Sequence, residues 1–113
     1  MKKTVQTQIY VGLNDSQTHE QKFDTKKYVE ILKNVCKSYH VAFSLHTVSG
    51  GYFHEDGSYV DENTLVLSLL DIDENTVMEI AKDLCAFFNQ ESVMVTGSPS
   101  VLYFISEKVD VNN

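Results

Sequence analysis

The sequence contains no arginine and no tryptophan, one proline, two cysteines and no long apolar run. Without arginine it lacks the planar, bidentate donor with which proteins grip phosphate groups and guanine. Nine lysines against sixteen acidic residues give a formal charge of −7, which repels a nucleic-acid backbone. We therefore expect no direct nucleic-acid binding. The acidity leaves two interpretations open: a negative surface that keeps the protein soluble, or a mimic of nucleic acid that occupies a basic partner.

No apolar run approaches the roughly 20 residues that a membrane helix needs, and the two lysines near the start precede no continuous apolar segment. We expect no membrane association and no secretory signal, and hence a cytoplasmic location in a bacterial or phage-infected cell. Cys36 and Cys85 match no zinc or thioredoxin spacing. We expect reduced, buried thiols, with a disulfide between two helices as the alternative.

Hydrophobic periodicity divides the first half of the chain into a strand and a helix. Residues 4–13 alternate with a period of two and include β-branched side chains, which predicts a strand. From Asp24 the apolar positions recur at steps of three and four, which predicts a helix that ends near His40.

Residues 41–70 predict two strands joined by a turn at residues 55–58, where Asp-Gly is a strong hairpin signal. The pair Gly50-Gly51 predicts a bulge or a bend in the first of them. A second helix is expected from Asp73 to about residue 90, with Asp73 as its N-cap.

The last segment, residues 91–106, predicts a strand, a break at residues 97–99, and a further strand at residues 101–105. The order β-α-β-β-α-β predicts a ferredoxin-like, split βαβ fold of the α+β class: an antiparallel sheet with two helices on one face. A length of 113 residues fits one domain. We expect it to cover residues 1–107, with a frayed tail at residues 108–113.

Two predicted strands, residues 65–70 and 101–105, are apolar at nearly every position. Because helices cover only one face of such a sheet, we expect the helix-free face to be covered by another copy of the chain, in a dimer or a higher ring. The alternative is a monomer whose carboxy-terminal segment folds across that face.

No catalytic or phosphate-binding motif is present. A calcium loop starting at Asp71 is excluded, since Thr76 and Lys82 stand where glycine and glutamate are required. The stretch "HEDG" places His54 close to acidic residues, but a metal site at His54, Asp56 and Glu62 would need convergence that a strand and turn do not supply. We expect Asp56 to support the turn, and we assign no catalytic residue, metal or cofactor.

Polar and aromatic side chains near the strand ends are the best candidates for ligand contacts. Each can also be explained by packing or by turn support. The candidates are Tyr10, His46, Tyr52, His54, Glu62 and Gln90.

Three segments, "TQIYVGL", "GGYFHEDGSYVDENTLVLSLL" and "FFNQESVMV", occur in this order and resemble a functionally uncharacterised bacterial family of small, often secreted proteins. That family carries Tyr-x-Gly, Gly-x-Trp followed by Asp-Gly, and Gln-Glu-Ser-Val motifs. The matching residues are Thr7, Tyr10, Gly12, Gly51, Asp56, Gly57, Phe88, Gln90, Glu91, Ser92 and Val93. Here the tryptophan is absent, and Phe87 stands where the family has arginine. The resemblance implies architecture and no activity.

The hypothesis that follows is a non-enzymatic, oligomeric binding module that captures a small molecule or a protein partner. One version of it is a phage-encoded antagonist of host defence that sequesters a nucleotide signal or inhibits a host protein. The alternative is a small, dimeric ferredoxin-like enzyme of the isomerase, oxygenase or hydrolase type, with His46 as its acid-base group.

Overall fold

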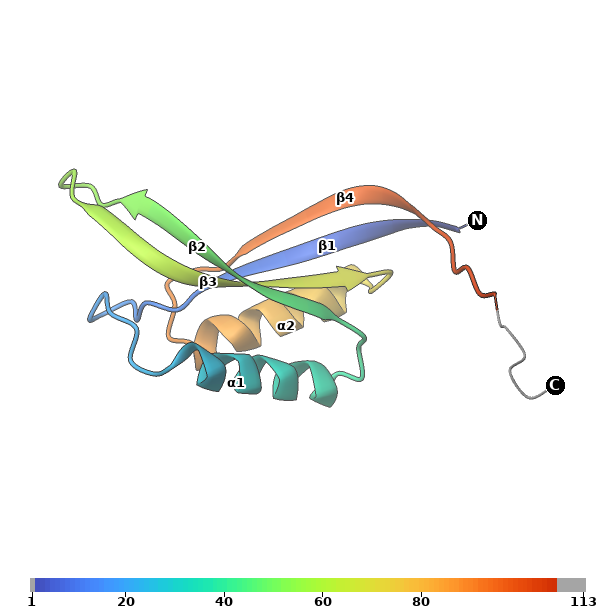
Figure 1. The fold of residues 1–113 in the computed structure, drawn as a ribbon, viewed down its shortest axis with the longest axis horizontal. Coiled ribbons are helices and arrows are strands. Elements are labelled where there is room, and N and C mark those ends of the chain that lie inside the picture. Colours follow the sequence, from blue (N-terminus) through green and yellow to red (C-terminus); the bar gives the residue numbers. More distant parts are fainter. Residues whose placement is uncertain (1, 108–113) are drawn as a thin grey trace.

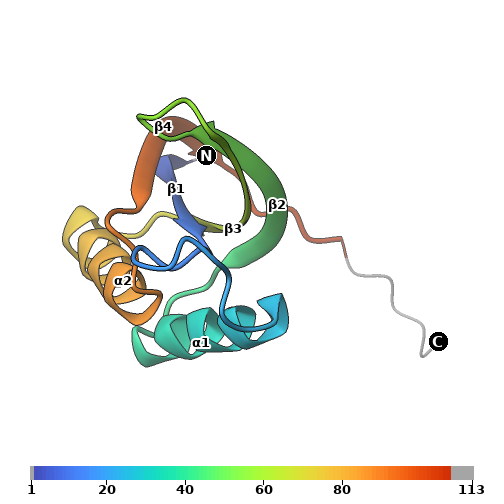
Figure 2. The ribbon, with the colours of Figure 1, turned by 90° about the vertical axis from the view of Figure 1, so that its left-hand side faces the viewer.

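The computed structural model describes residues 2–107. Its elements are β1 (Lys2–Gly12), α1 (Thr25–Ser38), β2 (Ser44–Phe53), β3 (Tyr59–Leu70), α2 (Glu74–Phe87) and β4 (Met94–Leu102). The four strands form one antiparallel sheet in the order β2-β3-β1-β4, and both helices lie on the same face of it (Figures 1 and 2). The predicted ferredoxin-like α+β fold is confirmed. The expected tail at residues 108–113 lies outside the described residues.

The core lies between the helices and one face of the two central strands. Ile9 and Val11 pair with Leu67 and Leu65, and all four are fully buried. Because side chains alternate between the faces of a strand, Leu69 points the same way. The helices add Leu32, Ile80 and Leu84 to this cluster.

Each helix ends where the periodicity predicted. Asp73 caps α2 by accepting a 3.0 Å hydrogen bond from the amide of Thr76. His40 and Asn89, just beyond α1 and α2, have positive φ values of 55° and 49°. This left-handed conformation is a common way to end a helix.

The helix-free face of the sheet is largely polar, contrary to the expectation from its apolar strands. In the apolar part of β3, residues 65–70, only Val66, Ser68 and Leu70 point to this face, because the three buried leucines point to the helices. Gln8 joins Ser68 and Tyr10 there through hydrogen bonds of 3.3 and 2.7 Å. Association of copies through this face stays a prediction, but the sheet does not supply the continuous apolar surface on which it was based.

Strand β4 differs most from the sequence-based expectation. It runs without a break through residues 97–99, and Pro99 pairs with Val5. Pro99 is tolerated because β4 is an edge strand and has a neighbour on one side only. The separate strand predicted at residues 101–105 was wrong, since residues 103–105 follow β4 without strand structure in the described chain.

The hairpin of β2 and β3 has its turn at residues 54–58, as predicted. Of the bulge or bend predicted at Gly50-Gly51, the bulge is excluded, because the register from Ser44↔Ser68 to Phe53↔Tyr59 has no interruption. Gly51 has a different reason to be glycine: the ring of Tyr59 lies over it and would overlap any Cβ.

Both cysteines are free; Cys36 is buried and Cys85 is partly buried. The disulfide considered from the sequence is therefore not formed. Burial raises the pKa of Cys36 to about 11, so this thiol stays protonated and unreactive at neutral pH. Among the described residues, no helix is both long and apolar enough to cross a membrane.

Candidate functional site

A hollow of about 330 Å³ lies where β1 ends and β4 begins, beneath the β2–β3 hairpin. Figure 1 shows this hairpin reaching beyond the helices, above the loop that follows β1. We call the hollow the hairpin site. Its lining residues are Asp15, Ser16, His19, Tyr52, His54, Glu62, Gln90, Glu91 and Ser92.

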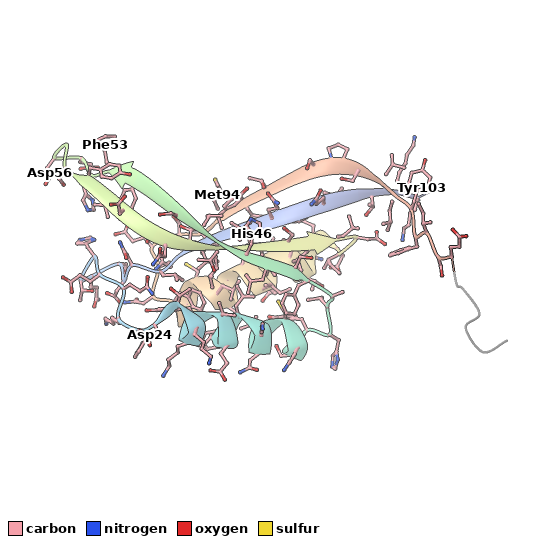
Figure 3. All side chains as sticks on the ribbon, viewed as in Figure 1. Asp24, His46, Phe53, Asp56, Met94 and Tyr103 are labelled. Atoms are coloured by element: carbon pink, nitrogen blue, oxygen red, sulfur yellow. The ribbon has the colours of Figure 1, made fainter. Side chains whose placement is uncertain are left out.

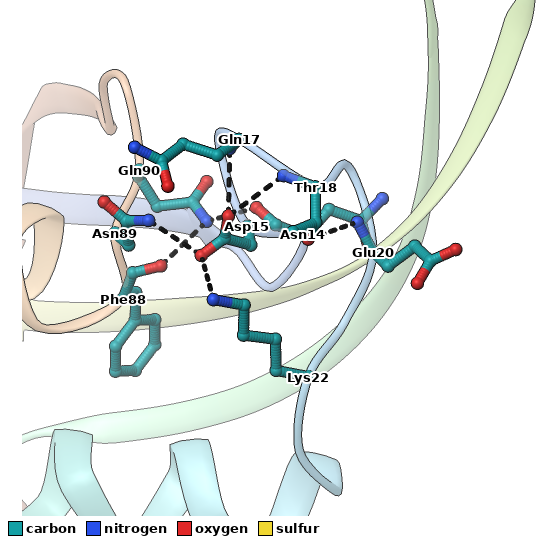
Figure 4. Close-up of polar contacts among 9 residues, drawn as sticks. All are labelled: Asn14, Asp15, Gln17, Thr18, Glu20, Lys22, Phe88, Asn89 and Gln90. Atoms are coloured by element: carbon teal, nitrogen blue, oxygen red, sulfur yellow. Dashed lines mark hydrogen bonds and ion pairs between the residues drawn. The ribbon is translucent and has the colours of Figure 1, made fainter.

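Asp15 fixes the loop that follows β1. Its carboxylate accepts hydrogen bonds from the amides of Gln17 (2.9 Å) and Thr18 (3.1 Å) and from Asn89 Nδ2 (2.7 Å), and it forms an ion pair with Lys22 at 3.2 Å (Figure 4). The side chain is buried, and these contacts, that of Asn89 foremost, hold its pKa well below the ordinary range. Asp15 therefore serves as a permanently charged structural centre of this side of the site.

The turn between α2 and β4 is joined to the same loop. The amide of Ser16 donates to the carbonyl of Asn89 at 3.0 Å, and Gln90 Nε2 donates to the carbonyl of Asn14 at 2.6 Å. The side-chain amide of Gln90 thus bonds to the neighbouring loop, and the side chain also lines the hollow. Glu91 and Ser92 follow it towards β4 and complete this wall.

Glu62 enters the site from β3. Its Oε2 accepts a 3.0 Å hydrogen bond from the amide of Asn14, which holds the carboxylate across the end of β1. Gly12 makes this possible, because a Cβ at that position would overlap the Glu62 carboxylate. The glycine of the "IYVGL" segment is thus explained by the close approach of a side chain rather than by a turn.

Three rings line the hollow, two from the hairpin and one from the loop after β1. Tyr52 and His54 meet edge to face with centroids 5.3 Å apart, and His54 meets His19 in the same way at 5.0 Å. Burial raises the pKa of Tyr52, and the negative charges of Glu62 and Glu91 raise it further. The Tyr52 hydroxyl is therefore protonated at neutral pH and available as a donor.

The "HEDG" turn divides its roles between structure and site. The amide of His54 donates to the carbonyl of Ser58 at 2.9 Å, and Gly57 adopts a φ of 86° that favours glycine. Asp56 accepts hydrogen bonds from the hydroxyl (2.6 Å) and amide (2.9 Å) of Ser58, which lower its pKa. Asp56 supports the turn, as predicted, and only His54 reaches the hollow. No cluster of three metal-ligating side chains occurs within residues 2–107.

Four of the six residues selected from the sequence meet in this one hollow: Tyr52, His54, Glu62 and Gln90. The other two do not. Tyr10 and His46 both flank Val66 on the helix-free face, in one row across three strands. Figure 3 shows His46 near the middle of the sheet, far from Asp56 at the hairpin tip. His46 is thus not placed to act in the hairpin site.

Sequence reasoning missed five of the lining residues: Asp15, Ser16, His19, Glu91 and Ser92. His19 lies in the loop that follows β1 and was not among the candidates chosen from the sequence. A usable signal existed for Glu91 and Ser92, because they follow Gln90 in one of the three recognised segments. No pattern in the sequence links Asp15 to Asn89, since the two lie 74 positions apart.

No protein-family model matches the sequence, and no curated protein matches it significantly. Solved structures with a similar fold include two of a phage SAM lyase. The apo structure has a TM-score of 0.69 at 21% identity and covers 96% of this chain and 93% of its own. The complex with S-methyl-5'-thioadenosine has a TM-score of 0.66 at 22% identity and covers 84% and 80%.

Two further structures have lower similarity. The GlnK–ATP complex of B. subtilis has a TM-score of 0.56 at 12% identity and covers 87% of this chain and 82% of its own. A DUF3240 family protein of Shewanella baltica has a TM-score of 0.55 at 10% identity and covers 95% and 100%. At these identities the four comparisons establish the fold and leave the chemistry to the site itself.

Proposed function

We propose that the protein binds S-adenosylmethionine, a sulfonium cation, in the hairpin site, with cleavage or capture of the intact compound as its two candidate fates. The observation that carries the proposal is the convergence of Tyr52, Glu62 and Glu91 in one hollow. A small cation gains from nearby carboxylates and from the face of an aromatic ring.

The charge of the site favours a cation over a polyphosphate. Three of the nine lining residues are acidic, and none of the nine is lysine. Lys22, the neighbouring cation, is engaged with Asp15. A nucleotide phosphate would meet Glu62 and Glu91 without a positive partner, which is unfavourable in a partly desolvated hollow. The charge thus argues against the nucleotide signal considered from the sequence.

The comparisons support an adenosine-containing ligand. Two of the similar structures are complexes, one with S-methyl-5'-thioadenosine and one with ATP, and both compounds contain adenosine. S-adenosylmethionine combines adenosine with a sulfonium charge, and so fits both the similar proteins and the acidic, aromatic site.

Cleavage to S-methyl-5'-thioadenosine would break the bond between sulfur and the aminocarboxypropyl carbon. Sulfur keeps the electron pair and becomes a neutral thioether. As this bond breaks, the carbon fragment either loses a proton from the adjacent carbon to form an alkene, or its own carboxylate displaces the sulfur and closes a lactone, so no water is consumed. His19 or His54 would accept the proton in the alkene route, and Glu62 and Glu91 would hold the substrate before its charge is lost.

Capture without turnover is the second candidate. Loss of the sulfonium charge in the transition state means that an acidic site binds the substrate more strongly than it binds the transition state. This favours sequestration, in line with the binding module expected from the sequence. In an infected cell, either fate would remove the compound from the host and would suit a phage-encoded antagonist of host defence.

The test measures binding and products with the same samples. We expect S-adenosylmethionine to raise the melting temperature and ATP to leave it unchanged. Glu62→Gln and Glu91→Gln should each weaken binding about tenfold or more, as expected for a charged contact of roughly 1.5–3 kcal/mol. Glu55→Gln, at the hairpin tip and outside the site, is the matched control.

Chromatography of the same mixture separates the two fates. Appearance of S-methyl-5'-thioadenosine supports cleavage, whereas recovery of the intact cation from a stabilised complex supports capture. Absence of stabilisation by S-adenosylmethionine, or equal binding by the two glutamine variants and the wild type, would overturn the proposal.

A further inference from the structure

The end of the molecule opposite the hairpin site carries an exposed apolar segment. Beyond the last residue of β4, Tyr103, Phe104 and Ile105 are 62, 89 and 93% exposed. Figure 3 places Tyr103 at the far end from Phe53 and Asp56. Residues 98–106 contain no charged side chain. Three large apolar groups in sequence on a surface of net charge −7 indicate a contact that the single chain does not make.

A complementary hollow lies on the same chain, where the paired ends of β1 and β4 extend past α2 (Figure 1). It has a volume of about 310 Å³, and we call it the arm hollow. Its apolar walls come from Val5, Ile72, Val77, Met78 and Val95. Val5 is half exposed and Met78 is 39% exposed, so the hollow is open to a partner.

The segment does not fill its own arm hollow. Leu102 pairs with Lys2 at the outermost register position of β1, three residues beyond Val5. From there residues 103–105 continue away from α2 (Figures 1 and 2), which agrees with the near-complete exposure of Ile105. Residues 103–105 therefore do not cover the sheet of their own chain, as the monomeric alternative required.

We propose that residues 103–105 of one copy pack into the arm hollow of a second copy. Two surfaces of an acidic protein can meet here because the segment is uncharged and Glu74 is the one charged residue that lines the hollow. The area is adequate: each aromatic side chain can bury roughly 150–250 Å². With Ile105, Val101 and the walls of the hollow, the contact approaches the roughly 800 Å² per partner of a stable interface.

The contact joins two different surfaces, so it is heterologous. Each copy would offer its segment to one neighbour and its hollow to another, which produces a ring when the rotation closes. This differs from the back-to-back contact through the helix-free face, in which the same surface meets itself. It also leaves the hairpin site of every copy free, since that site lies at the opposite end of the sheet.

Light scattering on a size-exclusion column at micromolar concentration tests the association. We expect the wild type to elute well above its monomer mass of 12.8 kDa. Phe104→Ser/Ile105→Ser and Met78→Lys should each shift it to the monomer, because they remove the segment or charge the hollow. Phe53→Ser is the matched control, since Phe53 is equally exposed (72%) but lies at the other end. Circular dichroism checks that every variant folds.

A disulfide test identifies the occupant of the arm hollow. Val5→Cys and Ile105→Cys are made in separate chains with Cys85→Ser, mixed, and oxidised. A crosslink between the two chains supports the proposal. In the chain that carries both cysteines, a crosslink within one monomer would show that the segment folds back on its own chain, and would overturn it. A monomeric wild type, or an oligomer unaffected by both sets of variants and without crosslinks, would overturn it equally.

Discussion

Asn89 donates a 2.7 Å hydrogen bond to the carboxylate of Asp15, and this contact joins the loop after β1 to the turn after α2. Both segments line the hairpin site, and residues 74 positions apart are needed to bring them together. The buried carboxylate of Asp15 therefore positions the wall of the site that carries Gln90 and Glu91.

Asp15→Asn tests this link through pH. Because folding lowers the pKa of Asp15, the stability it contributes is complete above its ordinary pKa of about 4 and is lost as the pH falls below that value. We expect the variant to have a lower urea midpoint at pH 7 and a weaker decline between pH 5 and pH 3 than the wild type. Parallel curves for the two proteins would contradict the role of Asp15, and Glu55→Gln serves as a surface control.

Gly12→Ala tests how Glu62 is held. A methyl group at Gly12 would overlap the Glu62 carboxylate, whereas one at Gly50 would make only ordinary contacts, 3.6 Å from the Glu62 carbonyl. Since the carboxylate is the flexible end of its side chain, it should move away at small cost to folding. We expect Gly12→Ala to weaken S-adenosylmethionine binding severalfold while Gly50→Ala does not, as measured by calorimetry. Equal affinities would contradict this account of Glu62.

Tyr39→Phe tests the contact between the helices. The Tyr39 hydroxyl donates a 2.6 Å hydrogen bond to Asp83, and this contact raises the tyrosine pKa to about 12. A raised pKa means that the contribution to stability is present below pH 10 and is lost as the pH rises from about 10 to about 12. Melting temperatures between pH 8 and pH 11.5 should therefore decline less in the variant. A tyrosine titration of the folded wild type without a late-ionising group would contradict the assignment.

Leu67→Ala and Leu70→Ala compare the two faces of β3. Leu67 is fully buried under the helices, whereas Leu70 is 40% exposed on the helix-free face. Truncation of a buried leucine costs about 2–5 kcal/mol of unfolding free energy, and we expect less than about 1 kcal/mol for Leu70. Urea unfolding of both variants measures the difference. Similar losses would mean that the helix-free face is covered by another copy, as the sequence led us to expect.

The element order and the core could be predicted because they depend on local information. Alternating residues such as Ile9 and Val11 specify a strand with one buried face, and the stripe that contains Leu32 specifies a helix. The glycine of the hairpin turn, Gly57, made a positive φ predictable, because glycine adopts this conformation without strain. Where local patterns were ambiguous the prediction failed: Gly97 and Pro99 resemble a break, yet an edge strand accommodates both.

The candidate site was predicted in part. Tyr52, His54, Glu62 and Gln90 were selected for their chemistry near strand ends, and the structure brings these four together. His46 and Tyr10 have similar chemistry and also lie near strand ends, but the register places both beside Val66, four positions along β3 from Glu62. Position along the sheet, rather than residue type, separates the two groups.

The sequence by itself determined the order of strands and helices and most residues of the core, because these depend on the spacing of side chains along a short stretch. Only the tertiary structure decided that Asp15, Glu62 and Glu91 share a hollow, and that residues 103–105 leave the sheet uncovered. Such relationships depend on the register of strands distant in sequence, and a register is set by the packing of the whole sheet.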